Sequence, residues 1–180
     1  MAQPQTRPPV TIVDYNARWP ALYDEEKGRI LAAIDPWVAD IQHVGSTAVP
    51  GLGAKPIIDI MVGRRSLDDA RHCIAPLETI GYQYIPEYED ELPERRYFRW
   101  PGGDTYRGRG SHHLHMVETT SDFWRRHLLF RDYLRRHPEV AREYECLKRE
   151  LAARYGADRE GYTEAKTEFI TSVEEKAGGN

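Results

Sequence analysis

The sequence predicts an α+β domain in which a mixed or antiparallel sheet is flanked by helices and followed by a C-terminal helical segment. Three observations predict this class. Short apolar runs rich in valine and isoleucine recur over the first two thirds of the chain, and a turn-rich segment containing glycine joins two of them. The last third is charged, periodic and nearly free of internal glycine and proline. A sheet that precedes a block of helices is typical of the α+β class.

The first part of the chain is expected to hold two helices and two neighbouring strands. Residues 18–34 place apolar side chains at helical spacing until an Asp-Pro pair ends the pattern, which predicts the first helix. Residues 38–44 and 56–62 are predicted strands, joined by the glycine-rich connection 45–53. A second helix is expected over residues 66–80.

Three short strands and three helices are expected in the rest of the chain. The strand-like pieces are separated by turn residues, and a flexible segment is expected at 101–104. Pro138 suits the first position of a helix, because that position needs no backbone N–H. In chain order, the strands are expected at 82–85, 95–100 and 112–118, and the helices at 123–136, 138–155 and 158–176.

Composition and charge limit the classes of function. A chain of 180 residues can bury one ordinary core, so we expect a single domain over 10–176 between disordered tails at 1–9 and 177–180. The net charge of -4 gives no overall attraction to a nucleic acid polymer. The sequence has no run of about 18 apolar residues, no signal-peptide pattern and no paired cysteine motif. A cytoplasmic protein with no membrane contact is therefore expected, and its oligomeric state is left open.

The clearest chemical pattern is a Gly45-Ser46 pair followed by Asp59, two residues before Met61. It resembles the signature of DNA polymerase beta-type nucleotidyltransferases, in which Gly-Ser precedes two acids separated by one apolar residue. Glycine lets the backbone approach a phosphate, Ser46 and Thr47 can hydrogen-bond its oxygens, and carboxylates hold Mg²⁺. Met61 stands where the second acid is expected, and a thioether is a poor Mg²⁺ ligand, which counts against a standard two-metal mechanism.

Two histidines offer a different metal set. Side chains alternate along a strand, so His113 and His115 share one face of the strand predicted at 112–118. If this strand neighbours that of Asp59, the three side chains form a carboxylate and two-histidine set suited to Mn²⁺, Fe²⁺ or Zn²⁺. A divalent metal, Mn, Zn or Mg, is the expected cofactor. Alternatively, the histidines are hydrogen-bonded polar residues and Asp59 forms a structural ion pair with Lys55 or an arginine.

Basic residues near this pattern can balance the charge of an anionic substrate. Lys55 precedes the strand of Asp59, and the two are the candidate catalytic residues, with Lys55 balancing charge. Arg95 and Arg99 share a strand face. The alternative for the arginines is an exposed, salt-bridged strand. For Ser46 and Thr47 the alternative is that they satisfy turn amides or cap a helix.

Five phrases spread over nearly the whole chain resemble the GrpB-like family, and together they are highly specific. The resemblance implies a nucleotidyltransferase-like fold, and relatives of this family are found fused to dephospho-coenzyme A kinase. It implies no particular reaction. The phrases are His43-Val-Gly-Ser-Thr-Ala-Val-Pro-Gly-Leu52, Lys55-Pro-Ile-Ile-Asp-Ile60, Arg95-Arg-Tyr-Phe98, His113-Leu-His115 and Phe130-Arg-Asp-Tyr-Leu-Arg-Arg-His-Pro138.

Two classes of function fit these features. The first is an enzyme that uses a metal to transfer a nucleotidyl or other phosphate-containing group to a small molecule, with Ser46 near phosphate and Asp59 on the metal. The second is a non-catalytic module that binds a nucleotide or small anion and has lost the second acid at Met61. A nucleotide or another phosphate-containing small molecule is the expected partner in both.

Overall fold

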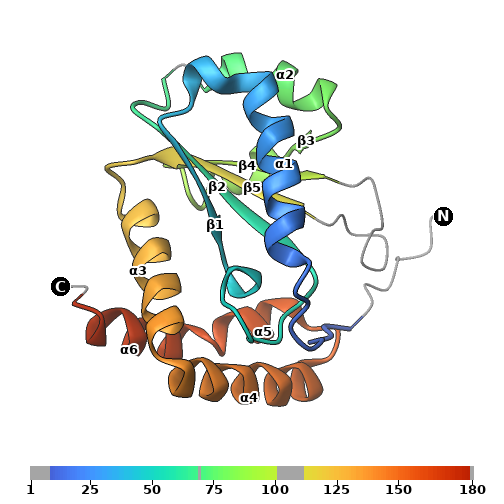
Figure 1. Cartoon of the computed structure of the whole chain (residues 1–180), viewed down its shortest axis with the longest axis vertical. Helices are drawn as coiled ribbons and strands as arrows, with labels where there is room; N and C mark the ends of the chain where they lie inside the picture. Colours follow the sequence, from blue (N-terminus) through green and yellow to red (C-terminus); the bar gives the residue numbers. More distant parts are fainter. Residues whose placement is uncertain (1–8, 69, 101–111, 179–180) are drawn as a thin grey trace.

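The computed structural model describes residues 9–68, 70–100 and 112–178. Its centre is a five-stranded sheet with the strand order β1-β2-β5-β4-β3 (Figure 1). β2 and β5 are parallel and the other neighbouring pairs are antiparallel, so the sheet is mixed. The strands are β1 (Asp40–Val44), β2 (Ile58–Arg64), β3 (Gln83–Tyr84), β4 (Arg95–Trp100) and β5 (His112–Glu118).

Two helices cover one face of the sheet. α1 (Trp19–Ile34) and α2 (Arg71–Thr79) pack there, and Figure 1 shows α1 in front of the strands. Every second residue of β2, among them Ile58 and Ile60, points to this face and is buried against the helices. The apolar stripe of α1 therefore has a matching apolar strand to cover, and this packing forms the main core.

The opposite face is covered over part of its area by α3 (Asp122–Arg136). Met61 and Val117 from this face pack with Trp124 of α3 in a buried cluster. Asp59, two residues before Met61, and His113, four residues before Val117, lie on the same face of β2 and β5, beyond this cluster. The side chains of Asp59 and His113 are 29% and 25% exposed to solvent, so this end of the face is open.

The C-terminal helices form a second group beside the sheet, and α4 runs across the end of α3 (Figure 1). The prediction for α4 (Pro138–Tyr155) is confirmed, but the single helix expected over 158–176 is wrong. The chain forms α5 (Arg159–Glu164) and α6 (Thr167–Lys176) instead. Tyr162 of α5 packs with Val10 and Leu151, and Val173 of α6 packs in a different cluster.

Other limits differ by a few residues. The second helix begins at Arg71 and not at residue 66, because the Asp68 N–H donates to Ser66 Oγ at 3.1 Å in a preceding turn. The strand predicted from residue 56 begins at Ile58, after a proline that has no N–H to donate. The strands predicted at 38–44 and 82–85 are shorter, as β1 and β3.

The predicted tails lie largely outside the described residues, as does the predicted flexible segment 101–104. At the N-terminal limit, Val10 is buried and its N–H donates to the Gly156 carbonyl at 3.0 Å. The domain limits 10–176 stay a prediction. Within the described part of the chain, no helix combines the length and the apolar character that crossing a membrane requires.

Candidate functional site

A cavity of about 170 Å³ lies where the β1–β2 connection meets the C-terminal helices. We call it the lysine cavity. It collects side chains from β2, β5, α4 and the α5–α6 region, which are far apart in the sequence. Its described lining consists of Ile12, Gly45, Ser46, Thr47, Ala54, Lys55, Ile57, Asp59, His113, Tyr144, Lys148, Tyr162 and Lys166.

Gly45 brings the backbone against Asp59. Its φ of 72° and ψ of -175° belong to a region that only glycine adopts readily. A Cβ atom at this position would lie 2.6 Å from Asp59 Oδ2. Glycine is therefore required here both by the turn and by the close approach of the carboxylate.

Asp59 meets both predicted histidines. His113 Nδ1 lies 3.1 Å from Asp59 Oδ1 and His115 Nε2 lies 3.8 Å from the same oxygen. Because an ionised carboxylate only accepts, His113 Nδ1 carries the proton and donates it. Burial raises the pKa of Asp59, but the hydrogen bonds and charges of His113 and His115 outweigh it and hold this pKa well below its ordinary value. Asp59 is therefore an ionised acid with two histidine partners.

As arranged, these three residues do not form a metal site. Among the described residues, no group of three or more His, Cys, Asp or Glu side chains is placed to hold a metal ion. Met61, in the position of the second acid, is fully buried with Val117 and Trp124. A two-metal arrangement therefore lacks a carboxylate, and binding by Asp59, His113 and His115 would require the direct Asp59–His113 contact to open.

Lys55, Lys148 and Lys166 make the lysine cavity positively charged. The acidic side chain in its described lining is Asp59. Lys148 Nζ donates to Ser46 Oγ at 3.0 Å and to the Gly53 carbonyl at 2.5 Å. Burial lowers the pKa of Lys148 to about 7, and the charges of Lys166 and Lys55 act in the same direction. Burial and Lys55 lower the pKa of Lys166 to about 8. Both shifts arise first from burial and second from the neighbouring positive charges, and a bound anion would oppose them.

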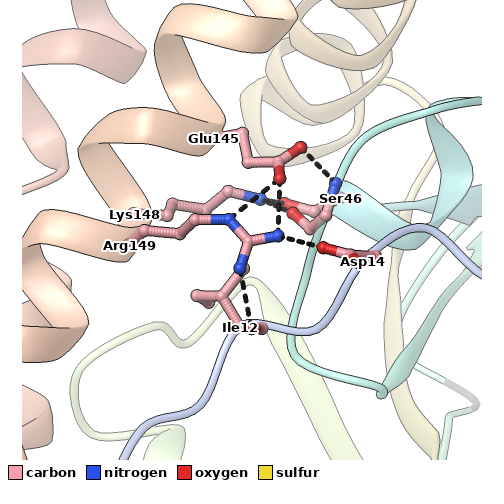
Figure 2. A network of polar contacts seen from close by, with 7 residues as sticks. Ile12, Asp14, Ser46, Glu145, Lys148 and Arg149 are labelled. Carbon is pink, nitrogen blue, oxygen red and sulfur yellow. Dashed lines mark hydrogen bonds and ion pairs between the residues drawn. The ribbon is translucent and has the colours of Figure 1, made fainter.

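A network of polar contacts fixes α4 against the glycine-rich connection (Figure 2). Glu145 accepts from the Gly53 N–H at 2.6 Å, one turn before Lys148. Arg149 donates to Glu145 at 2.7 Å, to Asp14 at 2.6 Å and to the Ile12 carbonyl at 3.2 Å. The network ties the N-terminal segment, the connection and α4 together, so the Lys148 ammonium group is held in place over Ser46.

The lowered pKa of Lys148 predicts a pH-dependent stability. Between its folded-state pKa of about 7 and the ordinary value of 10.5, the unfolded chain binds more protons at this residue than the folded chain. The free energy of unfolding should therefore rise with pH in this window, and the cost of burying the ammonium group should be fully present below it. Relative to Lys148→Met, the wild type should gain about 2–3 kcal/mol from about pH 7 to about pH 10. Urea unfolding of both proteins at each pH checks this, and a constant difference would contradict it.

The structure places the other predicted phosphate contacts unequally. Ser46 and Lys55 line the cavity, and Lys55 also lies 5.6 Å from the ring centroid of Tyr162. The Thr47 hydroxyl is buried between His43 Nε2 at 3.0 Å and the Ile57 carbonyl at 3.2 Å. This is a structural role, but it is neither the contact to turn amides nor the helix cap considered as the alternative, and the phosphate contact of Thr47 stays a prediction.

Arg95 and Arg99 share the sheet face of Asp59 but are not among the described lining residues. Arg99 donates to Gln83 Oε1 at 3.0 and 2.9 Å. Arg95 is half-buried beside the rings of Tyr97 and Phe123. Their predicted phosphate contacts stay predictions without support from this geometry.

Sequence reasoning assigned no role to Lys148 or Lys166. A signal for Lys148 was present, because Ala141, Tyr144, Lys148 and Leu151 recur at helical spacing and form the buried stripe of α4. A lysine within an apolar stripe is a buried lysine, and buried lysines need a partner or a function. Lys166 carried no such signal, since its position depends on the break between α5 and α6.

The fold and the Gly-Ser turn beside an acidic strand define the class of protein as one with a nucleotidyltransferase-like fold. The poly(U) polymerase Cid1, in a crystal structure with MgATP, superimposes with a TM-score of 0.51 at 10% identity over 80% of this chain and 44% of Cid1. At this identity the likeness concerns the fold alone.

The chain belongs to the GrpB family, because the model of the GrpB protein family matches residues 9–176. The UPF0157 protein YqkA of Bacillus subtilis is 40% identical over 168 residues, which is 93% of this chain but 47% of YqkA. The chain thus spans about half the length of that relative. The glutamate-rich protein GrpB of Alkalihalophilus pseudofirmus is 38% identical over 165 residues, which is 91% of this chain and 93% of that protein. A crystal structure of GrpB from Enterococcus faecalis superimposes with a TM-score of 0.81 at 32% identity. The superposition covers 93% of this chain and 96% of the Enterococcus faecalis chain.

Proposed function

We propose that this protein binds a phosphate-bearing small molecule and holds its phosphate group in the lysine cavity. The observation that carries the proposal is the convergence of Lys55, Lys148 and Lys166 around Ser46, with Asp59 as the acid in the described lining. Such an excess of buried positive charge destabilises the free protein and is neutralised by a dianion. A nucleotide or another small phosphate ester is the ligand class that fits.

Each side chain has a distinct part in this proposal. The Ser46 hydroxyl accepts from Lys148 and keeps its own O–H to donate to a phosphate oxygen. Lys148 has a third N–H beyond those used by Ser46 and Gly53, and Lys166 also lines the cavity. Gly45 lets the backbone of the turn lie against Asp59 in the wall of the cavity.

Asp59→Asn tests whether a metal mediates the binding. Without a metal, the carboxylate repels phosphate, so the variant should bind inorganic phosphate about 3- to 10-fold more tightly in a buffer that contains EDTA. Asparagine Oδ1 can still accept from His113, which keeps the turn in place. Calorimetric titration measures the effect, with the exposed Asp68→Asn as the matched control. Unchanged or weaker phosphate binding by Asp59→Asn in EDTA would contradict metal-free binding next to the carboxylate.

A metal-dependent group transfer is the second candidate. The convergence of Asp59, His113 and His115 favours it, together with His115 Nδ1, which is buried without a hydrogen-bond partner among the described residues. Titration of Mn²⁺, Zn²⁺ and Mg²⁺ into the stripped wild type and the His113→Ala/His115→Ala double variant tests it. Stoichiometric binding that the double variant loses supports this candidate, and no binding to the wild type rejects it.

A further inference from the structure

A second cavity, of about 420 Å³, opens from the same turn as the lysine cavity. We call it the aromatic cavity. Gly45, Ser46 and Tyr144 line both cavities, so the lysine cavity and the aromatic cavity adjoin at this turn. Its remaining described lining is Leu92, Glu94, Asp122, Phe123, Arg126, His127, Phe130, Thr167, Ile170, Thr171 and Glu174.

Flat rings form the walls of the aromatic cavity. Phe123 stacks on His127 with ring centroids 3.9 Å apart, and Phe130 meets Tyr144 edge to face at 5.4 Å. Phe123, His127 and Phe130 are half-buried, so part of each ring faces the cavity. Such walls favour a planar ring over a flexible chain, because stacking costs little conformational freedom.

An acidic acceptor lies at the buried side of the aromatic cavity. Glu174 is 8% exposed, and its Oε2 receives the Arg126 Nε–H at 2.8 Å. Its Oε1 makes no hydrogen bond within the described part of the chain. Glu94 and Asp122 add negative charge at the rim of the cavity, and Arg126 adds one positive charge. The aromatic cavity is thus acidic where the lysine cavity is basic, and it suits a ring that donates hydrogen bonds.

From this continuity and charge contrast, we propose that the aromatic cavity holds the base of a nucleotide whose phosphates occupy the lysine cavity. The base carries an exocyclic amino group, as adenine and cytosine do, and donates it to Glu174 Oε1. Its ring stacks on the face of Phe123 or Phe130. This inference rests on the proposed function, because the phosphates anchor the ligand.

Calorimetry with three metal-free probes, inorganic diphosphate, ADP and IDP, separates the two proposals. ADP should bind about tenfold or more tightly than diphosphate because of ring stacking. IDP presents a carbonyl in place of the amino group and should bind more weakly than ADP. ADP binding no tighter than diphosphate would overturn the base site and leave the phosphate site standing. Absence of diphosphate binding would overturn both.

Two variants link the result to the aromatic cavity. Glu174→Gln should reduce the preference for ADP over IDP and leave diphosphate binding unchanged. Thr171→Phe fills the mouth of the cavity from an exposed position of α6, so it should lower ADP affinity to that of diphosphate. Thr163→Phe, exposed on α5 and outside both linings, is the matched control. Full ADP affinity and preference in both cavity variants would place the base elsewhere and overturn the inference.

Discussion

Replacement of Lys148 by methionine is expected to weaken the binding of inorganic diphosphate about 10- to 100-fold. Methionine keeps the length and apolar stem of the side chain but removes the ammonium group that faces Ser46. A charged hydrogen bond in a buried site contributes about 1.5–3 kcal/mol, which corresponds to this range. Calorimetric titration at about pH 6.5, where Lys148 is charged in the folded protein, gives the largest difference.

Lys176→Met is the matched control for this experiment. Lys176 is exposed at the end of α6 and lies outside the described lining of the lysine cavity, so its loss should leave affinity within about twofold. A folded Lys148→Met protein that binds diphosphate as tightly as the wild type would remove Lys148 from the site. Circular dichroism confirms that the variant is folded.

Gly45→Ala should lower the free energy of unfolding by about 2–4 kcal/mol and abolish ligand binding. The backbone of Gly45 is in a glycine-only region, and the new methyl group would lie 2.6 Å from Asp59 Oδ2. Relief of the clash would require the turn to move away from Asp59, which disrupts the wall of the lysine cavity. Urea unfolding measures the loss.

Gly51→Ala separates the two causes. Gly51 also has a positive φ, 79°, but a Cβ atom there would have no neighbour within 4 Å. Its replacement should therefore cost only the conformational term, about 1 kcal/mol. Equal losses for Gly45→Ala and Gly51→Ala would show that the approach to Asp59 contributes nothing.

Local pattern was enough to predict most of the fold and half of the site. The alternation of β5 placed His113 and His115 on one face, and the parallel pairing with β2 brought that face to Asp59. The limits of β4 and β5 are those expected. Met61 was expected in place of the second acid, and its burial shows that this position belongs to the core.

Residues brought in by tertiary packing were beyond that reasoning. Lys148 meets Ser46 where Glu145 docks α4 on the glycine-rich connection, and a sequence separation of 102 residues leaves no local signal for this contact. The break that places Lys166 in the cavity arises because the helices bury side chains in two clusters. Helix propensity indicates only that the segments of α5 and α6 are both helical.

The central claim is that the lysine cavity is a phosphate site, and a crystal structure grown with tungstate tests it most directly. Tungstate mimics the charge and shape of phosphate and is located by its anomalous scattering. The account predicts one tungstate ion with an oxygen within about 3 Å of Lys148 Nζ, and with contacts to Lys166 and Ser46. Tungstate bound only at other positions, with solvent alone in the lysine cavity, would contradict it.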